Sequence, residues 1–287
     1  MKEKAIKLLF IFFGFLSIIF LGAIALTLLY QSLPFFKEVS FGHFFNGRFW
    51  YPTSDPPEFG LLPLLLASLQ VTLGALALGV PIGLGSALFL SEFSPYWLSE
   101  ILKPAIEILS GIPSVVFGLF GMTVVAPFVQ QLFKLPTGLT AFSASVVLGI
   151  MIIPTIVSIS EDAISSVPAN YKEASLAVGA NKWETAMKVT LPAASSGIAT
   201  SILLGTGRAI GETMTVLMVA GGAAVIPKSF FVPVRPITAT IASEMGEVPF
   251  GGLHFSALFA LAVVLFGFTF LLNLAAEYFT RKYKHTQ

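Results

Sequence analysis

Two charges of opposite sign, Arg208 and Glu212, interrupt a long apolar stretch of this sequence. Arg208 follows Ser196 by twelve residues, which in a helix is a rise of about 18 Å, close to the middle of a lipid bilayer. A charge at that depth costs about 2.5–3.5 kcal/mol on insertion scales, so it is a functional candidate by default. Glu212 comes four residues later and is expected on the same helical face. The pair is therefore either a structural ion pair or part of a path for a charged substrate.

The second alternative has a specific chemistry. The guanidinium group of arginine is a planar fork of N–H donors that suits tetrahedral oxyanions. A nearby carboxylate would weaken that attraction, and a transport path must release what it binds. Thr213 adds a hydroxyl that either meets the substrate or bonds to a backbone carbonyl. We expect Arg208, Glu212 and Thr213 to line a substrate path.

No other group of residues predicts catalysis, a metal site or nucleic-acid binding. The sequence has no cysteine, and its three histidines lie far apart. It shows no nucleophile–base pair and no Gly-x-x-x-x-Gly-Lys-Ser/Thr run, the loop that cradles nucleotide phosphates. The formal net charge of +1 gives no electrostatic footprint for nucleic acid. We therefore expect neither an enzyme nor a nucleic-acid-binding protein, and no metal ligands.

The elements that position these residues are membrane-spanning helices. Hydrophobic residues make up 55% of the 287 residues and charged residues only 11%, whereas soluble domains carry about 25% charged residues. The first apolar run is too long for a signal peptide and is followed by no small-residue cleavage site. About 20 apolar residues cross a bilayer, which predicts one all-α integral membrane domain, residues 1–287, with six spans. The expected spans are residues 8–30, 61–90, 108–130, 135–160, 193–225 and 255–276.

Lysine and arginine predict which side of the membrane each loop occupies, because they are in excess on the cytoplasmic side. With the N-terminus inside, ten of them fall in inner segments and five in outer ones. Both termini and the 161–192 loop are then cytoplasmic, and the protein is expected in the cytoplasmic (inner) membrane. The inner set is Lys2, Lys4, Lys7, Lys103, Lys172, Lys182, Lys188, Arg281, Lys282 and Lys284, and the outer set is Lys37, Arg48, Lys134, Lys228 and Arg235.

The 161–192 loop is polar and longer than a simple connection needs. Residues 170–179 suit a short helix, with Pro168 favourable in its first turn. Gly179 is able to take a positive φ and end that helix. Asn181–Val189 then suits a second short helix. The loop is either a compact knob that fits a partner or an amphipathic segment lying on lipid headgroups.

The spacing of residues in this loop resembles the EAA loop of ABC importer permeases. That pattern is Glu-Ala-Ala, three residues, Gly, nine residues, Ile, one residue and Leu-Pro. Two replacements, Ser175 for the second alanine and Val189 for isoleucine, are conservative. The resemblance implies the type I ABC importer permease fold and a loop that docks into a dimer of ATPase subunits, which bind the ATP and Mg²⁺ while this chain binds no cofactor. The residues that match in register are Glu173, Ala174, Gly179, Leu191 and Pro192.

A second run resembles a narrower group, the phosphate-specific transport permeases. Gly207-Arg-Ala-Ile-Gly-Glu-Thr-Met214 is similar to the signature of their PstC-type subunit. In that family the arginine and glutamate are implicated in phosphate passage. Three further stretches agree, at residues 59–63, 111–116 and 237–247. The resemblance implies a PstA-type second permease, a PstB-type ATPase dimer, a phosphate-binding protein at the outer face, and inorganic phosphate as substrate.

Two alternatives stay open at this point. Sulfate and molybdate permeases carry a related Arg-Ala-Leu-Gly-Glu-Phe run, so Thr213 and Met214 are what favour phosphate. A self-contained proton- or sodium-coupled carrier is also compatible with charges inside a span. Such a carrier would need neither ATP nor a partner, whereas a permease would need both.

Overall fold

The computed structural model describes residues 2–284, so the chain ends, Met1 and residues 285–287, lie outside it. Most of the described backbone is helical, as lipid requires, because a helix satisfies its own polar groups. In chain order the elements are α1 (Lys2–Glu38), α2 (Phe41–Asn46), β1 (Trp50–Tyr51), β2 (Glu58–Phe59), α3 (Leu62–Leu88), the π-helical turn η1 (Phe89–Phe93), α4 (Tyr96–Ser110), α5 (Ser114–Phe120), η2 (Gly121–Val125), α6 (Ala126–Phe133), α7 (Ala141–Ser165), α8 (Ala169–Ala177), α9 (Lys182–Thr185), η3 (Ala186–Thr190), α10 (Leu191–Ala193), α11 (Ser195–Gly211), α12 (Met214–Val219), α13 (Ile237–Glu244) and α14 (Leu253–Lys284).

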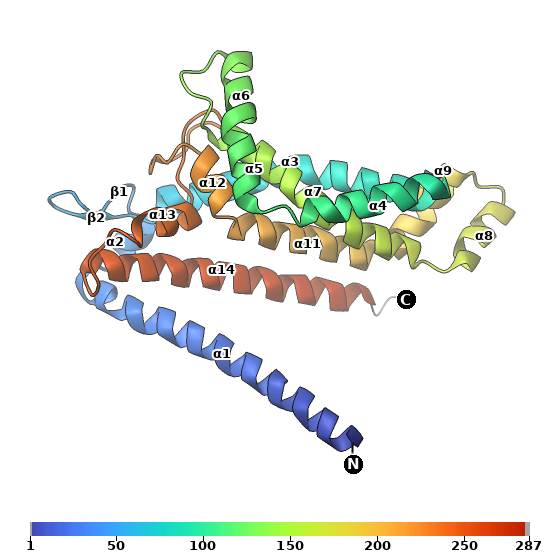
Figure 1. Ribbon diagram of the computed structural model, residues 1–287, viewed down its shortest axis with the longest axis horizontal. Coiled ribbons are helices and arrows are strands. Elements are labelled where there is room, and N and C mark those ends of the chain that lie inside the picture. Colours follow the sequence, from blue (N-terminus) through green and yellow to red (C-terminus); the bar gives the residue numbers. More distant parts are fainter. Residues whose placement is uncertain (1, 285–287) are drawn as a thin grey trace.

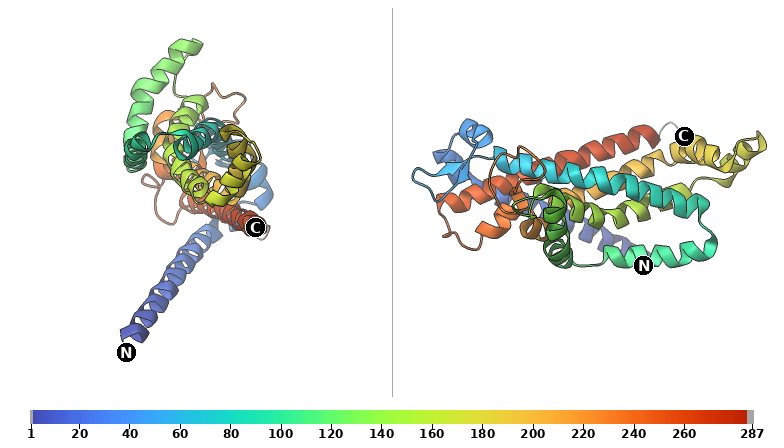
Figure 2. Two further views of the ribbon diagram at one scale, coloured as in Figure 1. Left: turned by 90° about the vertical axis from the view of Figure 1, so that its right-hand side faces the viewer. Right: turned by 90° about the horizontal axis from the view of Figure 1, so that it is seen from above.

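The long helices α3, α7, α11 and α14 form an elongated bundle (Figure 1). One end of the bundle, the hairpin end, carries α2, α13 and the antiparallel pair β1–β2, in which Trp50 faces Phe59. The opposite end, the α8 end, carries α8 and α9. Helix α1 diverges from the bundle, and α1 and α14 both direct their terminal ends toward the α8 end (Figure 2). The N-terminal part of α1, the C-terminal part of α14 and the 161–192 segment therefore lie toward the same end of the bundle.

Five helical segments among the described residues are long and apolar enough to cross a membrane. A sixth candidate is a bent pair, Lys182–Ala193 and Ser195–Gly211, whose axes differ by 71°. The 18-residue membrane window of the first segment is 0% buried, so this part of α1 presents its apolar side chains outward, whereas Phe35 near the end of the helix is buried. The other segments are Leu62–Phe93, Ser114–Phe133, Ala141–Ser165 and Leu253–Ala275.

Helices α3 and α7 form the tightest pair in the bundle. A Cβ atom added at Gly79 or Gly83 would lie 2.7 Å from the side chain of Ile152 or Ile156, respectively. Only glycine therefore fits at these two positions without a shift of α7. Within lipid the hydrophobic effect does not drive helices together, so such close packing supplies much of the association.

The expected span 108–130 is wrong as one continuous helix. Helix α4 ends at Ser110, and α5 begins at Ser114 after Pro113, which is extended at φ −59° and ψ 139°. Proline has no N–H to continue the ladder, and it moves the preceding residue away from helical geometry. The chain therefore breaks at residues 111–113 and changes direction before α5 and α6 (Figure 1).

The expected span 193–225 is also broken. Helix α11 stops at Gly211, and Glu212 is extended with φ −69° and ψ 130°. Only six further residues, Met214–Val219, are helical before a loop that reaches α13. Glu212 is therefore not one turn above Arg208 on a continuous helix, and the expectation that the two share a helical face is wrong.

Helix α7 is shifted toward the C-terminus relative to the expected 135–160: it begins at Ala141 and ends at Ser165. Glu161 and Asp162 belong to this helix and do not open the following loop. The Glu161 carboxylate is buried, and it is paired with Lys103 Nζ at 2.9 Å and with Ser165 Oγ at 2.6 Å. A buried charge persists when it is paired in this way, and the pair joins α7 to α4.

Candidate functional site

The two helix breaks lie next to each other inside the bundle. The first separates α4 from α5 at residues 111–113, and the second separates α11 from α12 at Glu212 and Thr213. Thr215 Oγ1 donates a hydrogen bond of 3.0 Å to the backbone oxygen of Ser114, which joins the two breaks directly. Non-helical backbone at membrane depth is tolerated where protein buries it or where it lines a cavity. We call residues 110–114 and 211–215 together the double break.

The guanidinium group of Arg208 lies at the double break. Its Nη1 atom donates to Ser110 Oγ at 3.4 Å and to Thr155 Oγ1 at 3.1 Å, and its Nη2 atom donates to the Ser110 backbone oxygen at 3.3 Å. A guanidinium has five N–H donors, so these three bonds leave donors available. The three acceptors are neutral, so they fix the orientation of the group without cancelling its charge.

Glu212 is buried, at 8% exposure, and its carboxylate is bound within its own turn. Its Oε1 atom accepts from the Thr215 N–H at 3.1 Å and so satisfies the start of α12. Its backbone oxygen accepts from Thr238 Oγ1 at 2.8 Å. Within the part of the chain that the structure describes, Glu212 and Arg208 form no ion pair with each other. The simple structural ion pair is therefore not what the fold contains.

Thr213 makes one of its two expected contacts, and Thr155 is a site residue that the sequence did not single out. The Thr213 hydroxyl donates to the Gly211 backbone oxygen at 3.3 Å, so it serves the turn between α11 and α12. Thr155, which sequence reasoning missed, holds Arg208 from α7. Its only sequence signal is a lone hydroxyl after Pro154 in an apolar run, and most such hydroxyls bond to their own helix.

The 161–192 segment contains the two short helices that the sequence predicts, although the second is interrupted. Gly179, between α8 and α9, has φ +95°, as expected. Asn181 caps α9: its Oδ1 accepts from the Glu184 N–H at 2.9 Å, and the Glu184 carboxylate accepts from the Asn181 N–H at 3.1 Å. The Asn181 N–H, followed by the positive charge of Lys188, lowers the pKa of Glu184 below its ordinary value. Helix α9 then passes into the π-helical turn η3 instead of continuing to Val189.

The residues that match the loop pattern lie on two faces of this segment. Glu173 and Ala174 are exposed on α8, and they are followed by Leu176 and the very exposed Val178. Ser175 turns inward, and its hydroxyl lies 2.9 Å from that of Thr185. Leu191 and Pro192 form α10, at the bend into α11: Leu191 packs against a buried cluster, whereas Pro192 is exposed. The segment thus has a free face with one acid and several apolar groups.

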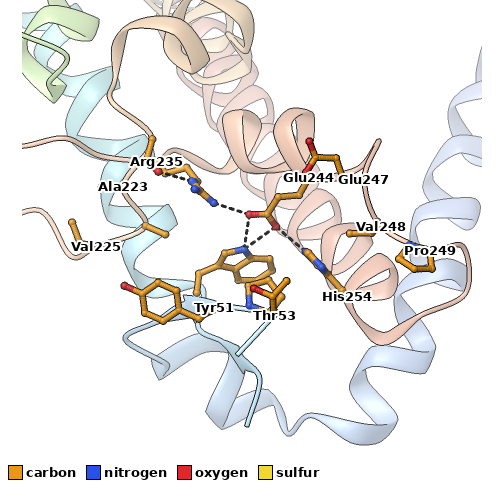
Figure 3. A pocket seen from close by; sticks show the side chains of 14 residues that line it. Tyr51, Thr53, Ala223, Val225, Arg235, Glu244, Glu247, Val248, Pro249 and His254 are labelled. Atoms are coloured by element: carbon orange, nitrogen blue, oxygen red, sulfur yellow. Dashed lines mark hydrogen bonds and ion pairs between the residues drawn. The ribbon is translucent and has the colours of Figure 1, made fainter. Parts of the chain in front are cut away.

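The hairpin end carries a third feature, a pocket of about 530 Å³ (Figure 3). Glu244 lies at its centre and accepts from Arg235 Nη1 at 2.7 Å, from Trp50 Nε1 at 3.1 Å and from His254 Nε2 at 2.8 Å. These residues come from β1, α13, α14 and the segment before α13, so one carboxylate ties four parts of the chain together. Glu247 lines the same pocket and is exposed.

Comparison with known proteins places this arrangement in a family. Residues 79–285 match the family model described as "Binding-protein-dependent transport system inner membrane component". A protein of Bacillus subtilis (strain 168) named "Probable ABC transporter permease protein YqgH" is 39% identical over 82% of this chain and 76% of its own length. "Phosphate transport system permease protein PstC" of Haemophilus influenzae is 34% identical over 96% of this chain and 92% of its own.

Solved structures of low sequence identity share the fold. The bacterial alginate ABC transporter in complex with a pentasaccharide-bound periplasmic protein matches with a TM-score of 0.66 and 15% identity, covering 96% of this chain and 94% of the matched chain. The inward-facing MetNI methionine ABC transporter matches with a TM-score of 0.61 and 20% identity, covering 80% and 99%. The expectation of an all-α type I ABC importer permease fold is thereby confirmed. The chain belongs to the family of binding-protein-dependent transport system inner membrane components, as a multi-pass permease subunit.

Proposed function

We propose that this chain is the PstC-type permease subunit of an ATP-driven importer that moves inorganic phosphate across the cytoplasmic (inner) membrane. The curated relatives named as phosphate transport permeases support this substrate. So does the geometry of the double break. The observation that carries the proposal is the guanidinium group of Arg208, which is held by two hydroxyls and one carbonyl. Among the residues that the structure describes it forms no ion pair, and part of its donor fork is left for a substrate.

That arrangement suits a tetrahedral oxyanion. Arginine binds such anions through parallel N–H bonds, and discontinuous helices recur at the substrate sites of membrane transporters. Ser110 and Thr155 accept bonds from both Nη1 and Nη2 of the guanidinium, so the group is oriented before the substrate arrives. Glu212 and Thr213 shape the turn beside it, through the bonds to Thr215 and Gly211. We therefore expect Glu212 and Thr213 to support the path in two ways: they keep the turn between α11 and α12 non-helical, and they place polar groups beside Arg208.

The partners follow from the two ends of the bundle. We infer that the α8 end is cytoplasmic, with both terminal helices beginning or ending there, and that the exposed face of α8 docks into a PstB-type ATPase dimer that binds ATP and Mg²⁺. The matched loop residues are Glu173, Ala174, Ser175, Gly179, Leu191 and Pro192. This chain would carry no nucleotide and perform no hydrolysis itself. A PstA-type permease would complete the membrane pair, and the exposed α1 supports such a contact or one with lipid.

The hairpin end would then face outward and receive a phosphate-binding protein. Exposed aromatic and acidic groups at this end, Tyr51, Glu247 and Phe250, are available to a partner. Arg235 and Glu244 are less available, because they are bound to each other.

The test is purification of the complex from native membranes, identification of its subunits, and reconstitution into vesicles. We expect two permeases and an ATPase dimer, and uptake of phosphate that needs ATP and the binding protein. Uptake of sulfate or molybdate in preference to phosphate would contradict the substrate. Uptake by this chain alone, without ATP, would contradict the whole proposal and favour an ion-coupled carrier.

A further inference from the structure

We propose that the ion pair between Glu92 and Lys172 is a mechanical link through which movement of the 161–192 segment drives α3. This inference rests on the proposed function, because it needs an ATPase acting on that segment. The Nζ atom of Lys172 on α8 lies 2.6 Å from Oε1 of Glu92 in η1, the turn that ends α3. The two residues are 80 positions apart in the sequence. They are positioning residues, since neither lies at the double break.

The pair differs from an ordinary surface ion pair in its burial. The side chains of Lys172 and Glu92 are 24% and 14% exposed, whereas the neighbouring pair of Lys188 and Glu184 is 75% and 41% exposed. Exposed pairs add little, because water and salt screen them and because both side chains lose freedom. A pair shielded from solvent is screened less. The first pair is therefore the one able to transmit a displacement.

A second contact holds the same two elements together. The ring of Phe93, at the end of η1, lies 5.8 Å from the ring of Trp183 on α9. Beneath both contacts is a buried apolar cluster that includes Leu90 from η1 and Ala186 from η3. Both short helices of the segment are thus attached to the end of α3, one by charge and one by an aromatic contact.

From η1 a continuous packed route leads to the double break. Helix α3 contacts α7 at Gly79 and Gly83, where no extra atom fits between the glycine and its isoleucine partner. Helix α7 carries Thr155, which accepts a hydrogen bond from Arg208. A displacement of α3 against α7 would therefore reach the guanidinium through rigid contacts. The chain itself offers a second route, because α10 leads directly into α11, which carries Arg208.

Without a demonstrated coupling, a row of contacts is only a spatial relationship. The alternative is that Glu92 and Lys172 only stabilise the fold. The two roles differ in what they predict for a complex that is assembled and hydrolyses ATP. A stabilising pair would lower the amount of complex, whereas a link would lower the phosphate moved for each ATP hydrolysed.

The experiment uses the complete complex with its binding protein, in vesicles, and measures phosphate uptake and ATP hydrolysis together. For Glu92→Gln we expect hydrolysis to persist while the uptake per ATP falls by about two-fold to thirty-fold, the range expected when coupling weakens by about 0.5–2 kcal/mol. The charge-swapped double variant Glu92→Lys with Lys172→Glu should recover coupling. Glu100→Gln, which removes an exposed charge from nearby α4, is the matched control and should leave the ratio unchanged.

A wild-type ratio in Glu92→Gln would overturn the inference, and so would an assembled charge-swapped variant that remains uncoupled. If these variants fail to assemble, the double variant Glu92→Cys with Lys172→Cys tests the link. Because the natural chain has no cysteine, a cross-linking reagent would join only these two positions within the chain. When the two cysteines are joined by a short reagent with two thiol-alkylating groups, the complex should be coupled, whereas the same sample before the reaction should not be. The inference is overturned if the double-cysteine complex moves the same amount of phosphate per ATP before and after cross-linking, or if this variant also fails to assemble. A wild-type complex that moves no phosphate would contradict the proposed function instead.

Discussion

Arg208 on α11 and Thr155 on α7 are joined by a hydrogen bond of 3.1 Å from Nη1 to Oγ1. The bond joins two helices through residues that are 53 positions apart in the sequence. Together with the Ser110 contacts, it places at the double break a charged group that has no carboxylate partner among the described residues. The first two predictions follow from this arrangement.

Replacing Arg208 by glutamine should abolish phosphate uptake while the complex still assembles. Glutamine keeps some hydrogen bonding but lacks the charge and the planar fork that match an oxyanion. Arg208→Lys should retain only a small part of the activity, because a point charge does not reproduce two parallel bonds. The measurement is uptake of labelled phosphate, with co-purification of the ATPase as the check on assembly. Normal uptake in Arg208→Gln would remove this residue from the path.

Thr155→Val should weaken transport while preserving the shape of the helix surface. The substitution removes an acceptor from a charged donor, which costs about 1.5–3 kcal/mol. Thr155→Ser keeps the hydroxyl and should behave nearly as wild type, so the comparison separates the hydrogen bond from packing. Uptake at low phosphate concentration is the suitable readout. Equal activity of the valine and serine variants would contradict a positioning role for Thr155.

Gly79→Ala should destabilise the protein by about 1–3 kcal/mol, the usual cost of an overpacked core. The added Cβ atom would lie 2.7 Å from the side chain of Ile152. Gly85→Ala on the same helix meets no atom within 4 Å, and it should be neutral or slightly stabilising, because alanine favours a helix over glycine. Thermal unfolding of the purified protein in one detergent checks both. A similar melting temperature for the two variants would mean that α3 and α7 pack less closely than the structure shows.

Asn181→Ala should loosen α9, because the loss of an N-cap side chain costs about 1 kcal/mol. Hydrogen exchange of the α9 amides in the purified protein measures the change, with the α7 amides as an internal reference. If α9 and α7 respond alike, the cap is not the cause.

The same helix should depend on pH. The pKa of Glu184 is lowered in the folded state, mainly by the Asn181 N–H, so the folded state binds fewer protons there than the unfolded state. The stabilisation is present above the unfolded pKa of about 4.3 and is lost as the pH falls through the lower folded pKa. Protection of α9 should therefore fall in acid, and Glu184→Gln should remove that dependence. Protection that rises in acid would contradict the sign.

Glu244→Gln should destabilise the hairpin end. The carboxylate receives bonds from Trp50, Arg235 and His254, and hydrogen bonds to charged groups contribute about 1.5–3 kcal/mol each. Glu247→Gln is the matched control, because this carboxylate lines the same pocket but is exposed. The melting temperature should fall for the first variant and stay near wild type for the second. The reverse order would show that Glu244 does not hold this end together.

Much of the architecture was predictable because lipid imposes a simple rule on composition. Apolar runs of span length identify most of the helices. Charge asymmetry predicts that the first and last helices and the 161–192 segment share a side, and in the structure α1 and α14 point toward the α8 end. The turn at Gly179 was predictable as well, since few residues other than glycine adopt a φ of +95°. The spacing from Glu173 to Pro192 was enough to indicate the family that the comparisons confirm.

The helix breaks and the partners of Arg208 were decided only by the tertiary structure. The sequence placed Arg208 and Glu212 four residues apart, which on an unbroken helix means one face. In the folded chain, bonds from Thr215 and Thr238 hold Glu212 in an extended conformation and end the helix. The Thr238 bond joins residues 26 positions apart, and local propensity contains no information about it, whereas the Thr215 bond lies within the turn itself. Thus the sequence by itself determined which charges enter the membrane, and packing alone decided that Arg208 would meet hydroxyls instead of Glu212.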